Sequence, residues 1–141
     1  MKLVRSLAAT AAAFAAFAAP IPAMAHGTQT KGEAVKQAFQ YEIANVPGKS
    51  LTALIVNYAP GGKTQPHRHG SAFVTAYVLS GAIRSQLDDG EVRVYHAGES
   101  WTERPGQHHT VSENASDTEP ARLLAVFVAD SSDKNLVILD K

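Results

Sequence analysis

Short apolar runs separated by turn residues dominate the chain from residue 39 onward. Segment 51–58 is apolar and β-branched and ends at Pro60-Gly61-Gly62, and Asp88-Asp89-Gly90 separates two further runs as a hairpin turn. The pattern predicts about nine strands, over residues 39–43, 51–58, 72–79, 83–87, 91–95, 100–103, 109–113, 122–128 and 136–139. Many short strands without a clear amphipathic helix are typical of an all-β sandwich or barrel.

The first 25 residues have the features of a secretory signal peptide. Lys2 and Arg5 give a positive start, residues 7–19 are apolar, and Ala23-Met24-Ala25 forms a small-x-small cleavage site. A membrane anchor is the alternative, but the apolar run is shorter than the roughly 20 residues that span a bilayer. We therefore predict a signal peptide over residues 1–25, export to the periplasm or outside the cell, and no stable membrane insertion.

The remaining residues suffice for one domain with one core. Residues 26–38 are small and polar, which predicts a flexible leader, and residues 39–141 form the expected barrel domain. Without Lys2 and Arg5 the chain has eleven basic residues against 13 acidic ones, and no basic patch indicates a nucleic-acid partner. The chain contains no cysteine, so packing without disulfides has to stabilise the exported domain.

Histidines are concentrated in two short segments that suit metal binding. The first is Pro66-His67-Arg68-His69-Gly70, and the second is Pro105-Gly106-Gln107-His108-His109. Side chains alternate along a strand, so His67 and His69 are expected on the same face. A third imidazole from the distant segment would complete a set of ligands for a divalent first-row metal with open positions. Two histidines on a solvated turn are the alternative.

These two segments resemble the two signature motifs of the cupin superfamily, whose members include small single-domain barrels. The resemblance covers about residues 50–130, and the stretch Tyr77-Val78-Leu79-Ser80-Gly81 is similar to the usual end of the first motif. Positions that match the two motifs in spacing are Gly61, His67, His69 and Gly81 in the first, and Gly98, Gly106 and His109 in the second. Val74 stands where the first motif has its glutamate, Pro105 is displaced by one residue and Asn114 arrives one residue late.

The resemblance implies a double-stranded β-helix, or jelly-roll barrel, that encloses a metal. It implies His67, His69 and His109 as ligands, and the missing glutamate puts a four-ligand site in doubt. Fe(II) is the favoured metal, with Zn, Mn, Ni or Cu as alternatives. Three-histidine cupins include dioxygenases that act on diketones and on thiol acids.

Glu103 is expected to replace the missing carboxylate. Period-two alternation places it on the same face of its strand as Trp101. A carboxylate buried there is costly unless it is paired or bound to a metal. Glu103 is therefore our candidate catalytic residue, either as an acid or base beside the metal or as a fourth ligand, and an ion pair with Arg104 at the rim is the alternative.

Four residues are expected to line a substrate pocket. Gln65 shares the parity of His67 and His69, with a plain loop position as the alternative. Phe73, Tyr77 and Trp101 are aromatic residues near the motifs, and the alternative is an ordinary core position, which is the commoner place for aromatic residues on strands. His108 should point away from His109 towards a surface edge, although it would also suit a role in orienting a ligand imidazole.

The sequence thus indicates an exported three-histidine metalloenzyme of dioxygenase type with a small oxygen-bearing substrate. A non-catalytic cupin that binds or senses a metal or small ligand is the alternative. Isomerase or decarboxylase chemistry needs no dioxygen, but neither motif has a second carboxylate or a lysine nearby. The apolar Phe39-Tyr41-Ile43 segment also allows a homodimer, or an ordinary edge strand.

Overall fold

Strands are the only regular elements in residues 32–141, the part of the chain that this computed structural model describes. The predicted signal peptide and residues 26–31 of the predicted leader lie outside the described residues. The strands are β1 (Glu33–Glu42), β2 (Lys49–Tyr58), β3 (Lys63–Thr64), β4 (His67–Arg68), β5 (Phe73–Ser80), β6 (Ala82–Leu87), β7 (Arg93–His96), β8 (Ser100–Glu103), β9 (His108–Asn114), β10 (Ala121–Asp130) and β11 (Ile138–Leu139). The all-β prediction is therefore confirmed.

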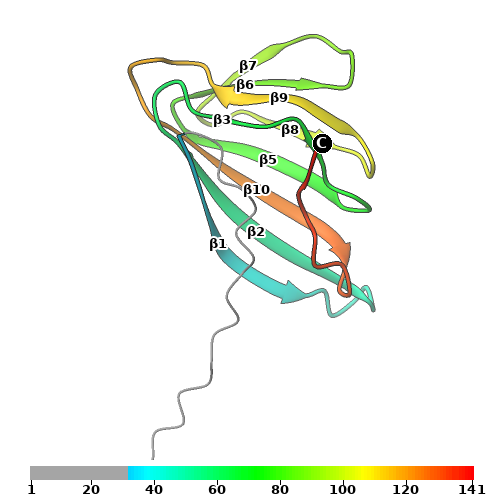
Figure 1. Cartoon of the computed structure of the whole chain (residues 1–141). Helices are drawn as coiled ribbons and strands as arrows, with labels where there is room; N and C mark the ends of the chain where they lie inside the picture. The colour runs from blue at the N-terminus through cyan, green and yellow to red at the C-terminus, as the bar shows by residue number, and fades with distance from the viewer. Residues whose placement is uncertain (1–31) are drawn as a thin grey trace, which may run out of the picture.

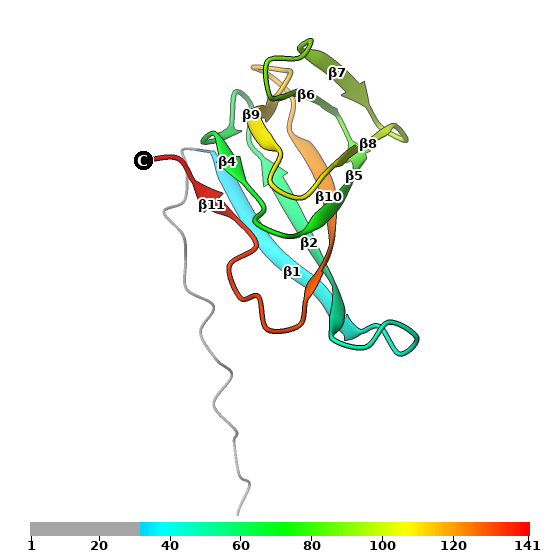
Figure 2. The same ribbon diagram turned by 90° about the vertical axis from the view of Figure 1, so that its right-hand side faces the viewer.

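Two antiparallel sheets face each other and enclose the interior (Figures 1 and 2). The five-stranded sheet has the order β1-β2-β10-β5-β8, and the six-stranded sheet has the order β11-β4-β9-β6-β7, with β3 also paired to β9. In both sheets most neighbouring strands are far apart in sequence, such as β2 and β10 or β4 and β9, as expected for a jelly-roll barrel. No helix in the described residues is long and apolar enough to cross a membrane.

A strand forms in each predicted range; the boundaries agree to within two residues except at β1, and the short strands β3 and β4 were not predicted. β1 begins at Glu33, so residues 33–38 belong to the sheet rather than to a flexible leader, and the predicted domain start at residue 39 is wrong. β1 is an edge strand whose side chains are mostly exposed on both faces, so it lacks the alternation that marks a half-buried strand. The two-residue strands β3 and β4 are too short to produce a period.

Inward-facing side chains divide into an apolar core and a cavity wall. Val56, Val78, Ile83 and Trp101 belong to the cluster that fills one end of the barrel. A second cluster contains Val74 and Phe127 and lies towards the histidine segment, because Phe127 contacts the ring of His69 with centroids 5.1 Å apart. Side chains of both clusters, Val56 and Val74 among them, also line the cavity described below.

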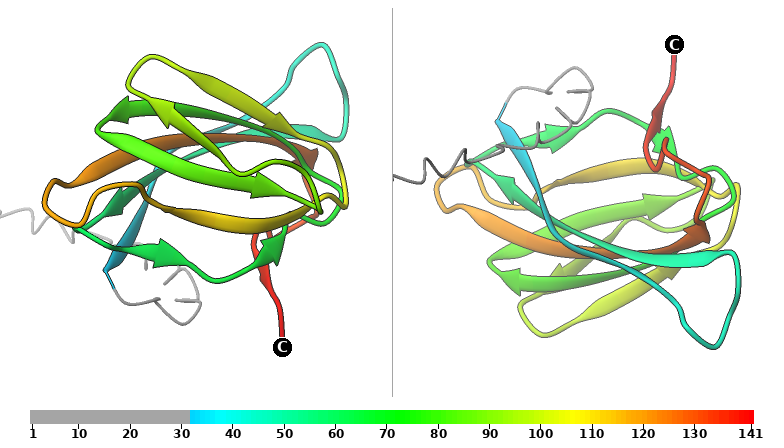
Figure 3. Two further views of the ribbon diagram at one scale, coloured as in Figure 1. Left: turned by 90° about the horizontal axis from the view of Figure 1, so that it is seen from above. Right: turned by 90° about the horizontal axis from the view of Figure 1, so that it is seen from below.

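The five-stranded sheet lies nearer the viewer in the right-hand view of Figure 3, and the side chains on its outer face are mainly apolar. Strand register places three rows of side chains on this face, because directly paired residues point to the same side. The rows are Tyr41, Leu51, Val128 and Phe73; Phe39, Ala53, Val126 and Thr75; and Lys36, Ile55, Leu124 and Tyr77. Near-continuous apolar runs such as β10 are typical of strands covered on both faces.

Gly81 joins β5 to β6 in a turn that packs closely against the backbone of Pro120. Its φ of +71° lies in the left-handed region, and a Cβ atom there would meet the backbone oxygen of Pro120 at 2.7 Å. Gly48 has a φ of +77° but nothing within 4 Å of such an atom. We expect Gly48→Ala to lower the free energy of unfolding by about 1 kcal/mol and Gly81→Ala by about 3 kcal/mol.

Urea unfolding of both variants measures this difference. Equal losses of stability would contradict the close approach of the Gly81 and Pro120 backbones.

Candidate metal centre

The strand pairing of β4 with β9 brings the three predicted ligand residues together. His67 is directly opposite His109 in this pair, and His69 follows two residues after His67. All three are buried, and one nitrogen from each lies within 4.8 Å of those of the other two. The alternation of His67 and His69 therefore places both imidazoles inside, and the solvated-turn alternative is wrong.

Backbone carbonyls fix the orientation of two of the imidazoles. Nδ1 of His67 lies 2.7 Å from the carbonyl oxygen of Gln65, and Nδ1 of His69 lies 2.7 Å from that of Leu136. A carbonyl oxygen only accepts hydrogen bonds, so both Nδ1 atoms carry a hydrogen. In the neutral ring, Nε2 then keeps its lone pair for a metal.

His109 is oriented by two side chains inside the barrel. Its Nε2 lies 2.9 Å from Oγ of Ser85, and its Nδ1 lies 3.3 Å from Oε1 of Glu103. If Nε2 donates to Ser85, the lone pair of Nδ1 is left on the side of Glu103. The indole of Trp101 closes this side, with its ring centroid 6.0 Å from that of His109.

Glu103 lies among the histidines, as its inward parity predicts. It is 2% exposed, and the register of β5 with β8 places it directly opposite Val74, the residue at the position of the missing glutamate. Its Oε1 accepts a hydrogen bond of 3.1 Å from Nε1 of Trp101. The carboxylate therefore reaches the histidine cluster from the neighbouring strand, and the predicted alternative of a rim ion pair with Arg104 is wrong.

The second oxygen of Glu103 has an unusual environment. Oε2 is buried and lies 3.2 Å from Nε2 of His69, yet within the described residues it makes no hydrogen bond of good geometry. With the hydrogen of His69 on Nδ1, both facing atoms are acceptors that repel each other. A proton on Nε2 or a cation near both atoms would relieve this repulsion.

Burial and mutual repulsion keep the cluster ready for a cation. Burial, with smaller contributions from His109 and His69, lowers the pKa of His67 to about 4. Burial also lowers the pKa of His109. Burial opposes ionisation of Glu103, but the His69 contact, the charges of His109 and His69 and the Trp101 hydrogen bond outweigh it, so the pKa of Glu103 is lowered. Neutral imidazoles beside a carboxylate are the protonation states that a metal requires.

A divalent transition metal fits this set of groups. One cation satisfies all converging acceptors at once, whereas one proton satisfies only one facing pair. Imidazole and carboxylate are ordinary ligands of first-row metals, and the donor set does not distinguish among Fe, Zn, Mn, Ni and Cu. The structure thus supports a transition metal without identifying it.

The cluster lines a cavity of about 490 Å³ that is partly open to solvent. His67, His69, His109 and Glu103 line it together with apolar residues of the five-stranded sheet, namely Leu54, Val56, Val74, Ala76, Leu123, Ala125 and Phe127. The C-terminal segment covers another side through Lys134, Asn135, Leu136, Val137 and Leu139, and it runs beside the barrel to β11 (Figure 2). The volume suits a small molecule.

The predicted pocket residues are mostly elsewhere. Phe73 and Tyr77 are 40% and 42% exposed on the outer face, because Val74 between them points inwards, so their predicted pocket role is wrong. Gln65 is exposed in the turn before β4 and contributes only its carbonyl oxygen. Trp101 is buried behind Glu103 and His109 rather than in the cavity wall.

Other residues that shape the site carried weak signals or none. His108 lies at the surface, where its Nε2 contacts Oδ2 of Asp140 at 2.8 Å, as its predicted outward orientation requires. Ser85 shares the inward parity of Ile83, which would have been enough to suggest it. The carbonyl of Leu136 has no signature, because a backbone group carries no sequence information.

Comparisons with known proteins agree with this architecture. The model of the Cupin domain family matches residues 54–127. Oxalate oxidase is similar in structure at 24% identity and a TM-score of 0.58, over 77% of this chain and 55% of that chain. A double-stranded beta-helix protein from Klebsiella pneumoniae gives 19% identity and a TM-score of 0.61, over 79% of this chain and 87% of that one.

The structure of KdgF from a Halomonas species is also similar, at 24% identity and a TM-score of 0.54, over 72% of this chain and 83% of that one. A search of curated proteins gives no match. Identities this low show a shared fold, and the chain spans only about half the length of the oxalate oxidase chain.

The lowered pKa of His67 predicts how the metal-free protein responds to pH. The folded value is about 4 against 6.5 for the free group, so the unfolded chain binds its proton first as the pH falls. Stability that is present above pH 6.5 is therefore lost between pH 6.5 and 4, by about 3 kcal/mol for His67. Urea unfolding from about pH 7.5 to about pH 4.5 measures this loss.

His67→Gln is the matched variant, because it removes the titrating ring and retains a polar side chain. It should flatten the dependence in this range. A wild-type curve no steeper than that of the variant would show that His67 is not held neutral by burial.

Proposed function

Since the chain belongs to the cupin domain family, we propose that it is an exported three-histidine metalloenzyme of dioxygenase type that acts on a small oxygen-bearing substrate. The observation that carries the proposal is the convergence of three buried imidazoles and the unsatisfied Oε2 of Glu103 on one region of the cavity wall. Export rests on the signal-peptide features of residues 1–25.

His67, His69 and His109 are the proposed metal ligands. Neutral imidazoles leave the full charge of a divalent cation at the site, so the metal would polarise a substrate's oxygens and, as Fe(II), would supply chemistry with dioxygen. The carbonyls of Gln65 and Leu136 hold two of the rings in the required tautomer.

Glu103 is the proposed proton acceptor. Its Oε1 accepts a hydrogen bond from the indole of Trp101, Oε2 makes no hydrogen bond among the described residues, and Glu103 is one of the residues that line the cavity. Burial opposes ionisation of Glu103, but the surrounding histidines outweigh it and lower the pKa of this carboxyl group. Oε2 is thus placed to take a proton from a substrate bound beside the histidines. A direct role as fourth ligand is the other reading of the same position.

The cavity limits the class of substrate. Its wall is mainly apolar, and the three histidines and Glu103 form a polar cluster within it, so a small molecule with an apolar body and oxygen atoms at one end fits best. Structures of the similar oxalate oxidase include a complex with glycolate, which supports a small substrate that presents oxygen atoms but says nothing of an apolar body.

A non-catalytic cupin that binds or senses a metal or small ligand is the competing function. The same cavity would serve it equally well. The two functions differ in substrate-dependent consumption of dioxygen, which only the enzyme performs.

Metal content and oxygen uptake test the proposal together. The exported protein, purified without chelator or histidine tag, should contain close to one transition metal per chain, and His67→Ala/His109→Ala should contain almost none. With iron bound, dioxygen uptake is expected with a small diketone, phenol or thiol. Elemental analysis and an oxygen electrode provide the measurements, and an absence of metal even after anaerobic reconstitution would contradict the proposal.

Glu103→Gln separates catalysis from binding in the same assay. If Glu103 is a proton acceptor, Glu103→Gln should lower kcat by about 10²- to 10⁴-fold and retain the metal content. As a fourth ligand, its loss should instead lower metal affinity. The exchange variant Val74→Glu/Glu103→Val returns the carboxylate to the facing strand and is expected to restore part of whichever property was lost. Full activity in Glu103→Gln would exclude both roles.

We also propose that the apolar outer face of the five-stranded sheet pairs with the same face of a second copy. Four strands about 4.8 Å apart and three rows about 6.8 Å apart give this face a flat area of roughly 400 Å² in each copy. The side chains that project from the sheet make its accessible surface larger. Two copies would bury on the order of 1,000 Å², which is the lower range of specific interfaces. Apolar sheet faces pack against each other. The Lys49–Asp130 ion pair leaves no net charge at one edge of the face, and Lys36 is the charged side chain among the three rows.

The dimer predicts a concentration-dependent mass. Sedimentation equilibrium from about 1 to about 200 µM should show dimerisation that Val126→Lys, in the centre of the face, abolishes. Val94→Lys changes an exposed residue of the other sheet and should leave it intact. A wild-type monomer over this range, or a persistent dimer in Val126→Lys, would contradict this interface, and binding of the monomer to phosphatidylcholine vesicles would assign the face to lipid instead.

A further inference from the structure

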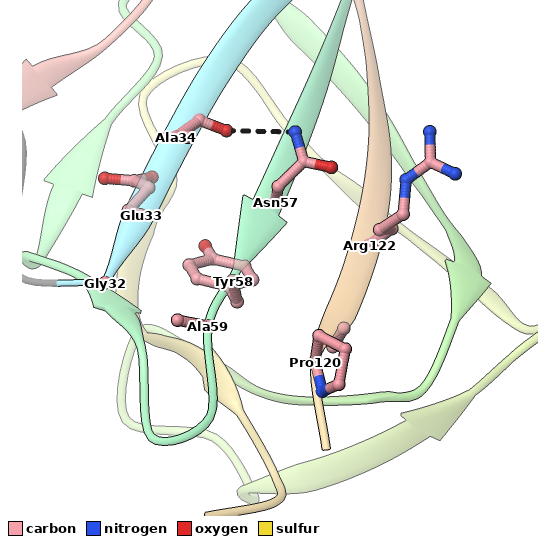
Figure 4. Close-up of a pocket in the computed structure, with 9 residues that line it drawn as sticks. Gly32, Glu33, Ala34, Asn57, Tyr58, Ala59, Pro120 and Arg122 are labelled. Carbon is pink, nitrogen blue, oxygen red and sulfur yellow. Dashed lines mark hydrogen bonds between the residues drawn. The ribbon is translucent and has the colours of Figure 1, made fainter. Parts of the chain in front are cut away.

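A second polar cluster lies in the cavity and is not used by the proposed chemistry. It joins four strands from both sheets through Ser112, Tyr58, Thr64 and Glu33. Oγ of Ser112 lies 2.9 Å from the hydroxyl of Tyr58, which lies 2.5 Å from Oγ1 of Thr64, and Thr64 donates a hydrogen bond of 2.5 Å to Oε1 of Glu33. Figure 4 shows Glu33 and Tyr58 on the neighbouring strands β1 and β2.

The direction of this hydrogen-bonded chain follows from counting hydrogens. The single hydroxyl hydrogen of Thr64 goes to Glu33, so Thr64 must accept from Tyr58. The single hydrogen of Tyr58 is then used, so Tyr58 must accept from Ser112. Burial raises the pKa of Tyr58 to about 12, which keeps its hydrogen in place. Every hydrogen in the chain therefore points away from Ser112 and towards Glu33.

This direction leaves Ser112 with only acceptor capacity towards the cavity. Its side chain is buried and lines the cavity, and within the described part of the chain its Oγ bonds only to Tyr58. Its one hydrogen is committed, so its remaining lone pairs can only accept. A ligand group that faces Ser112 must therefore donate a hydrogen bond.

The cluster has a defined position relative to the histidines. Thr64 of β3 is paired with Ser112 of β9. His67, three residues after Thr64, is paired with His109, three residues before Ser112. Three residues of extended chain span roughly 10 Å. Apolar side chains from the opposite sheet, including Val56 and Leu123, line the same cavity. The cavity thus has two polar ends and an apolar wall.

We propose that Ser112 is a recognition subsite for a hydroxyl group of the ligand, at the opposite end from the oxygen atoms that face the histidines. The proposal deepens the proposed function, on which it rests, by naming the substrate class: a small molecule with an apolar body, metal-binding oxygens at one end and a hydrogen-bond donor at the other. Tyr58, Thr64 and Glu33 are positioning residues that hold Ser112 as an acceptor.

The subsite selects against groups that cannot donate. A carboxylate or a fluorine atom at the same point would face the lone pairs of Ser112 and find no hydrogen. Sites built for a hydroxyl reject analogues that lack it, because a buried polar group is then left unpaired. The alternative is that the four side chains serve only to tie β1, β2, β3 and β9 together.

Three related diketones test the subsite. They are 1-phenylbutane-1,3-dione and its para-hydroxy and para-fluoro forms, in which fluorine has nearly the size of a hydroxyl but cannot donate. Isothermal titration calorimetry should give a dissociation constant about five- to tenfold lower for the hydroxy form than for the fluoro form. Ser112→Ala should abolish this preference. Tyr58→Phe should weaken it, because the hydrogen of Ser112 is then free to turn towards the ligand.

The controls separate this proposal from the metal. Thr102→Val, on the exposed outer side of β8, should keep the wild-type preference. Each titration is run on metal-loaded and on metal-free protein, and the metal content is measured separately. Failure to bind metal would contradict the proposed function. The preference for the hydroxy form would then be measured on the metal-free protein. Equal constants in the wild type, an unchanged preference in Ser112→Ala, or no binding of the hydroxy form to either protein would overturn the subsite.

Discussion

The burial of facing acceptor atoms is the constraint around which this barrel is organised. Nε2 of His69 and Oε2 of Glu103 lie 3.2 Å apart with both side chains buried, and two further imidazoles converge on the same region. Such an arrangement is costly in an apolar interior unless a positive charge balances it. The backbone carbonyls that hold the Nδ1 hydrogens remove the simplest relief, a change of tautomer. A bound cation would balance all of these acceptor atoms at once.

Sheet register decides how this cluster is assembled. Pairing of β4 with β9 sets His67 against His109, while pairing of β5 with β8 sets Val74 against Glu103. A carboxylate moved to the opposite residue of an antiparallel pair stays on the same face, with Cβ atoms only about 5 Å away. The departure from the cupin motif at Val74 therefore leaves a carboxylate within the cavity. The apolar remainder of the wall then confines polar recognition to the two ends.

Much of this could be predicted from the sequence, where residues obey a local period. His-x-His and the parity of Trp101 with Glu103 gave the correct inward faces, because both segments are extended. The same rule, applied from Val74, would have placed Phe73 and Tyr77 outside; aromatic character was the misleading signal. Gln65 failed because Pro66 interrupts the strand, so parity does not carry across it. The early start of β1 and the carbonyl of Leu136 depend on tertiary pairing, which no local pattern records.

The position of a bound metal is the most direct test of the central claim. Crystals of the protein grown with Mn(II) or Co(II) and measured at the absorption edge of that metal should show one strong anomalous peak, bounded by His67, His69 and His109 and facing Glu103. Metal–nitrogen distances of about 2.0 to 2.3 Å to all three imidazoles are expected. A peak only at the protein surface, or none at saturating metal, would contradict the account and leave the histidine cluster as a polar feature of the core.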